Sequence, residues 1–123
     1  MSMSVEQFLS LSDAEQLQTI KDLNDIGQEE IIIDVLTGVG IDNLSVPLLG
    51  ELGRAYNNND KPEEAIKVFK AIDTEHRDAV WYYRCAYSHG SIASTNHEAY
   101  TSENMQRMLA LVDNGVRLAT KED

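Results

Sequence analysis

An internal repeat with a period of 33 residues restricts the possible folds of this sequence more than any other feature. Residues 49–58 (LGELGRAYNN) align with residues 82–91 (YYRCAYSHGS). The matched pairs include Leu49 with Tyr82, Leu52 with Cys85, and Gly53 with Ala86. A period of this length is typical of stacked structural units, and small residues such as Gly53 allow neighbouring helices to approach closely. The repeat therefore predicts helix pairs in tandem.

The first repeat carries clear signals for two helices. Ser45 can cap a helix whose first turn accepts Pro47. The apolar face of that helix consists of Leu48, Leu49, Leu52, Ala55 and Tyr56. Asp60 and Glu63 have the spacing of a capping box, which predicts the start of a second helix. The apolar side of the second helix consists of Ala65, Ile66, Phe69 and Ile72.

The N-terminal part of the chain also predicts helices. Ser12 and Glu15 form a second capping-box pair, at the start of a helix expected for residues 12–26. A short extra helix near Ser4 would be anchored by Phe8 and Leu9.

Residues 28–37 (QEEIIIDVLT) contain β-branched residues, which favour a strand. A single strand among helices would leave its backbone groups unpaired, so we predict a helix, broken by Gly38 and Gly40.

The second repeat is less regular. Its first helix is expected at residues 78–89 and to stop at Gly90. Residues 91–101 are rich in Ser, Thr and Asn and predict a loop. A last helix follows at about residues 102–120. Its expected buried side consists of Met105, Met108, Leu109, Val112, Val116 and Ala119.

Several residues of the first repeat together resemble the tetratricopeptide repeat (TPR) motif, a helix pair of about 34 residues. These residues are Leu49, Leu52, Gly53, Ala55, Tyr56, Ala65 and Phe69. Residues 46–78 match the motif, and residues 79–120 form a degenerate second repeat with a loop insertion at 90–101. The chain is similar to small bacterial proteins of this family, with a divergent N-terminal segment at residues 1–45. The resemblance implies one all-α domain spanning residues 1–123, a right-handed superhelical stack of about five or six helices.

Two repeats are fewer than a stack usually needs, because about three units are required to bury a continuous core. We expect residues 12–37 to supply the missing pair. Alternatively, two chains could associate as a homodimer and so complete the core.

The charge of the chain excludes some partners. It has 21 acidic and 10 basic residues, for a net charge of −11, so nucleic acid and anionic membranes would repel it. Residues 1–45 alone carry a net charge of −8. This asymmetry allows two interpretations: an ordinary solvated surface, or an acidic surface that attracts a basic protein. The candidate acidic residues are Asp22, Asp25, Glu29 and Glu30.

The sequence shows no pattern for catalysis, a cofactor or a metal. Cys85 is the only cysteine and is expected to be buried and inert, and a chain without disulfides suits the cytoplasm. The three histidines lack the spacing of a metal site, and no phosphate-binding loop occurs. We predict neither a secretion signal nor a membrane span.

The TPR resemblance places a candidate binding surface on a concave face formed by the first helix of each pair. The positions there are Arg54, Asn57, Asn58, Tyr83, Arg84 and Tyr87. Tyrosines are common in interfaces, although these two could instead pack between repeats. Gly50 and Arg54 do not reproduce the family's carboxylate clamp.

We therefore expect a non-enzymatic module that binds another protein through this face. The alternative is an acidic immunity or inhibitor protein that neutralises a basic toxin or nuclease.

Overall fold

The computed structural model describes residues 2–95 and 102–122, and within these ranges it contains helices and no strands. The all-α class is therefore confirmed. The α-helices are α1 (Val5–Leu9), α2 (Asp13–Asp25), α3 (Glu29–Val39), α4 (Val46–Asn58), α5 (Pro62–Lys70), α6 (Ala79–Thr95) and α7 (Ser102–Glu122). Two short 3-10 helices, η1 (Ile41–Asn43) and η2 (Thr74–His76), lie in connections.

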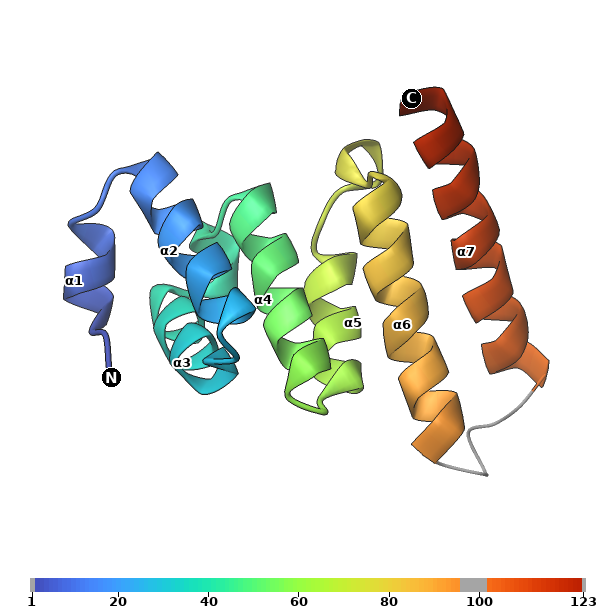
Figure 1. Cartoon of the computed structure of the whole chain (residues 1–123), viewed down its shortest axis with the longest axis horizontal. Coiled ribbons are helices and arrows are strands. Elements are labelled where there is room, and N and C mark those ends of the chain that lie inside the picture. Colours follow the sequence, from blue (N-terminus) through green and yellow to red (C-terminus); the bar gives the residue numbers. More distant parts are fainter. Residues whose placement is uncertain (1, 96–101, 123) are drawn as a thin grey trace.

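Three antiparallel helix pairs follow one another along the molecule: α2 with α3, α4 with α5, and α6 with α7 (Figure 1). The first helices of the pairs, α2, α4 and α6, run in the same direction, and α4 contacts both of the others. Successive pairs are also joined by contacts of α3 with α4 and of α5 with α6. The short α1 packs against α3 at the N-terminal end. Residues 12–37 thus form a helix pair that extends the row in front of the first repeat.

Polar side chains at the helix starts explain where several helices begin. The Ser12 hydroxyl accepts a hydrogen bond from the Glu15 amide (3.2 Å), and the Glu15 carboxylate accepts one from the Ser12 amide (3.0 Å). This second bond stabilises the ionised form and lowers the pKa of Glu15. Ser4 caps α1 in the same way, and Ser45 caps α4. The predicted starts of α2 and α4 are confirmed.

The capping box predicted for Asp60 and Glu63 is wrong. Asp60 has a φ of 56°, in the left-handed region, and Lys61 precedes α5 without a capping side chain. Aspartate tolerates the left-handed conformation better than most residues, so Asp60 reverses the chain after α4 and does not cap α5.

The β-branched segment is helical, as predicted, but Gly38 lies inside α3 and does not break the helix. α3 buries Ile32, Val35 and Leu36 against its neighbours and ends at Gly40, whose φ of 100° suits glycine. Tertiary packing therefore outweighs the strand propensity of the isoleucines. Of the two predicted anchors of α1, Phe8 is buried, but Leu9 is 55% exposed and anchors nothing.

The expected stop at Gly90 is wrong, because α6 continues to Thr95. Residues 91–95 are helical and not part of a loop; residues 96–101 of the predicted loop lie outside the described part of the chain. Gly90 serves helix packing instead. A Cβ atom at this position would lie 3.0 Å from the Met108 sulfur of α7, so the missing side chain makes room for that contact.

The expected buried side of α7 is largely exposed. Leu109, Val112 and Val116 are 59%, 44% and 59% exposed, and Ala119 is exposed too. α7 rests on α6 through another part of its surface: a Cβ atom at Gly115 would lie 3.2 Å from the Tyr82 Cβ, and Leu111 packs against the core. Met108 is partly buried, and the Met105 side chain lies outside the described part. An apolar stripe of α7 therefore faces solvent.

The close contact of α4 with α5 depends on Gly53. A Cβ atom there would lie 2.8 Å from Cδ1 of the buried Phe69 ring and closer still to two further ring carbons. We expect Gly53→Ala to lower the free energy of unfolding by about 2 kcal/mol, because the ring must move within a packed core. Urea unfolding followed by circular dichroism measures this change.

Gly50→Ala, on the same helix, is the matched control. Its Cβ would meet the Arg84 side chain only at 3.4 Å, and alanine favours a helix over glycine by about 1 kcal/mol. The control variant should be at least as stable as the native chain. Equal losses in the two variants would contradict the role assigned to Gly53.

Candidate partner-binding face

A buried carboxylate joins the first helices of all three pairs. Glu51 of α4 is 4% exposed, and its side chain accepts hydrogen bonds from Arg84 Nη2 of α6 (3.1 Å) and Arg54 Nη1 of α4 (3.3 Å). From α2, Asn24 Nδ2 donates to the Glu51 backbone oxygen (3.1 Å) and to Glu51 Oε1 (3.3 Å). Two guanidinium groups thus balance a charge that would be costly to bury alone.

The polar network continues outward from Glu51 on both sides. Arg54 Nη2 lies 3.1 Å from Asp25 Oδ1 of α2, and Arg84 Nη1 donates to the Gly50 carbonyl of α4 (3.1 Å). Asn57 Nδ2 donates to the Arg84 carbonyl (3.0 Å), and the Ser88 hydroxyl donates to Asn57 Oδ1 (2.7 Å). Polar bonds of fixed geometry therefore set the register of α2, α4 and α6.

All six residues predicted for partner binding line one pocket of about 190 Å³. They are Arg54, Asn57 and Asn58 of α4 and Tyr83, Arg84 and Tyr87 of α6. Tyr83 and Tyr87 are 71% and 52% exposed, so they do not pack between the helix pairs. Asn58 is exposed as well. The TPR resemblance thus grouped residues that the structure also brings together.

Sequence reasoning treated Arg54, Asn57 and Arg84 as open to a partner, but their polar atoms already take part in internal bonds. They act mainly by holding the pocket in shape.

A second hollow, of about 310 Å³, adjoins Arg84 and was missed by the sequence analysis. It lies among α2, α4 and α6, and its wall includes Lys21, Pro47, His76 and Trp81. The signal for Lys21 was available, since it is the only basic residue among the first 45. Trp81 is held by a bond from its Nε1 to the Phe69 carbonyl (2.9 Å) and is 7% exposed, so it forms a rigid wall.

The predicted acidic residues lie around the turn between α2 and α3. Asp22 and Glu30 are exposed and Glu29 is partly exposed. The Asp25 side chain is 64% exposed, yet it pairs with Arg54 and so also belongs to the network of the binding face. Of the four predicted acidic residues, only Asp25 forms an ion pair with a residue that lines the pocket.

Cys85 is 3% exposed on α6, and burial raises the pKa of its thiol to about 11, although Arg77 and Lys70 act in the opposite direction. Nearby, burial together with Arg107 and Lys70 lowers the pKa of His89. A protonated thiol in the core is a poor nucleophile, in agreement with the expected structural role of Cys85.

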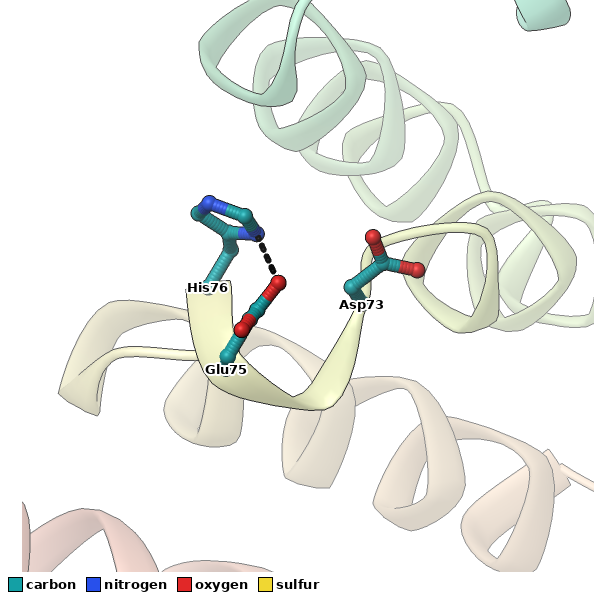
Figure 2. A group of neighbouring side chains, drawn as sticks. All are labelled: Asp73, Glu75 and His76. Atoms are coloured by element: carbon teal, nitrogen blue, oxygen red, sulfur yellow. Dashed lines mark ion pairs between the residues drawn. The ribbon is translucent and has the colours of Figure 1, made fainter.

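Asp73, which precedes η2, forms a small group with Glu75 and His76 of η2, and their ligand atoms lie within 4.8 Å of one another. Figure 2 shows the Glu75 carboxylate facing the His76 ring, with 4.0 Å between Oε1 and Nδ1. All three side chains are exposed, and exposed groups of this kind are common without an ion. We assign no metal site to them.

No described helix combines the length and the apolar character needed to span a membrane.

Comparisons of the chain with protein-family models, curated proteins and solved structures returned no match. The resemblance to TPR proteins therefore stays a prediction, and the binding face described above rests on the sequence and the structure themselves.

Proposed function

We propose that this protein is a non-enzymatic module that binds a segment of another protein at the face formed by α2, α4 and α6. The observation that carries this proposal is the pair of exposed tyrosines, Tyr83 and Tyr87, beside a pocket built on a fixed polar network. Tyrosine supplies a large contact area with few rotatable bonds and is enriched in protein interfaces.

The polar network favours binding because it lowers the entropic cost of ordering side chains when a partner binds. Glu51 already holds the Arg54 and Arg84 side chains in place, so a partner need not immobilise them. The second hollow, with Lys21 and His76 in its wall, extends the face toward α2. A partner segment that crosses from α6 to α2 could use both hollows.

The chemistry of the face also supports a binding role. At its centre, the Glu51 carboxylate is paired with both Arg54 and Arg84, which leaves none of these three groups as an evident general acid or base. The thiol of Cys85 lies in the core.

Capture from native cell lysate tests the proposal. The double variant Tyr83→Ala/Tyr87→Ala should lose a protein that the native chain retains. With that protein purified, calorimetry should show an affinity lower by about 30-fold or more, as expected when a central aromatic contact is removed. Glu64→Ala/Lys67→Ala, which removes an exposed ion pair on α5, is the matched control and should bind normally. Retention of the same proteins by all three chains would overturn the proposal.

The acidic N-terminal region supports a second candidate function, neutralisation of a basic toxin or nuclease. The residues to change are Asp22, Glu29 and Glu30, each to Lys; Asp25 stays because it pairs with Arg54. On this alternative, a small basic protein would be lost by the charge variant and retained by the tyrosine variant. Its association rate with the native chain should fall as salt is added. A partner lost only by the tyrosine variant would contradict this alternative.

A further inference from the structure

An apolar groove runs between α6 and α7 at the C-terminal end of the row of helices. It consists of two hollows, of about 410 Å³ and about 310 Å³, that share Tyr83 and Val112. Val80 and Tyr87 line it from α6, and Met108 and Val116 line it from α7. None of the described residues that line the two hollows carries a charge. We call this surface the C-terminal groove.

The internal repeat shows what kind of element fits the C-terminal groove. The offset of 33 residues matches Pro47, Gly50, Arg54 and Asn57 of α4 with Val80, Tyr83, Tyr87 and Gly90 of α6. On α4, this side receives α6: Arg84 donates to the Gly50 carbonyl, and Asn57 donates to the Arg84 carbonyl. On α6, the matching positions line the C-terminal groove. The groove therefore lies where a further helix would pack.

The residue types at the matching positions differ between α4 and α6. α4 offers small and polar residues, such as Gly50 and Asn57, to a helix that makes polar bonds. At the matching positions α6 offers exposed apolar and aromatic side chains, with Val80 49% and Tyr83 71% exposed. The exposed Val112 and Val116 of α7 continue this surface. An apolar patch of this kind marks an interaction site.

The distribution of charge along the chain is compatible with a second copy covering the groove. Residues 79–122 contain four acidic and four basic residues, while the rest of the chain contains 17 acidic and 6 basic ones. On α7, Asp113 and Arg117 also pair with each other (2.9 Å). Two such acidic chains repel each other least when their C-terminal ends meet and their acidic N-terminal ends point apart.

We propose that the C-terminal groove binds the same groove of a second copy, so that two chains pair through α6 and α7 about a twofold axis. Such an interface is self-complementary, because each chain supplies both the groove and the exposed side chains that fill it. The two hairpins then form a four-helix arrangement with an apolar centre. The C-terminal groove shares Tyr83 and Tyr87 with the partner-binding pocket, so the test below uses Val112 and Val116, which do not line that pocket.

Sedimentation velocity tests the pairing at concentrations up to about 200 µM. The native chain should show twice its mass of 13.8 kDa, while Val112→Asp and Val116→Asp should weaken association by at least about 100-fold through a charge placed in the apolar interface. Ile26→Asp is the matched control: it adds the same charge at a 63% exposed isoleucine beyond α2, and the pair should persist.

Circular dichroism must show that all three variants remain helical. A native chain that stays a monomer at every concentration would overturn the proposal. So would a pair that survives both groove variants, or one that Ile26→Asp disrupts equally.

Discussion

Replacing Arg84 with methionine is expected to lower the free energy of unfolding by about 3 kcal/mol. The variant keeps most of the apolar stem of the side chain but removes the bond to Glu51 Oε2 (3.1 Å). The Glu51 side chain is 6% exposed, so its carboxylate would remain buried after losing one of its two guanidinium partners. Urea unfolding at neutral pH, followed by circular dichroism, measures the loss.

Two further variants test this explanation. Arg54→Met should cost only about 1 kcal/mol, because Asp25 is mostly exposed and Asn24 still donates to Glu51 Oε1. Glu51→Met combined with Arg84→Met should recover much of the loss, since the pair is then replaced by apolar groups. If the double variant were less stable than Arg84→Met alone, the cost would not come from the unpaired carboxylate.

The thiol of Cys85 is expected to react with iodoacetamide about 100-fold more slowly in the folded protein than in urea near pH 8. The factor follows from the pKa, which burial raises from 9.0 to about 11 and which reduces the thiolate fraction accordingly. Cys85 is the only cysteine, so the mass gained by the intact chain measures the reaction directly.

The same shift gives a pH dependence. The raised pKa favours the folded state fully below about pH 9, and this contribution is lost as the pH rises toward about 11. Cys85→Ala should remove this part of the pH dependence of unfolding. Fast alkylation of the folded chain would show that α6 opens readily or that the thiol is more exposed than 3%.

Much of the fold could be predicted because its signals are local. Ser12 and Ser45 mark helix starts through bonds to amides three residues away, and these bonds form in the structure. Asp60 failed as a cap because the same residue type also suits a left-handed turn, and only the packing of α4 on α5 decides between the two uses. Gly90 failed as a stop because a small residue can serve close packing as well as a helix end.

The largest error of the sequence analysis concerns which side of α7 is covered by other helices. The spacing of Leu109, Val112 and Val116 correctly shows that they share a side of α7, but periodicity carries no information about whether another element covers that side.

At the candidate binding face, the TPR resemblance grouped six residues that line one pocket in the structure. It could not show that the Glu51 carboxylate already pairs with Arg54 and Arg84, because the contact with Arg84 requires α4 and α6 to lie beside each other.

The one-sided packing of α7 has a consequence for how the chain opens. α7 packs mainly on α6, whereas α4 is held by α2, α3, α5 and α6. In a linear array each unit is stabilised by its nearest neighbours, so an end unit opens at a smaller cost than a central one. Fluctuations that detach α7 would leave the network around Glu51 intact. The protein therefore combines a centre that is held by neighbours on several sides with a C-terminal helix that is held mainly on one.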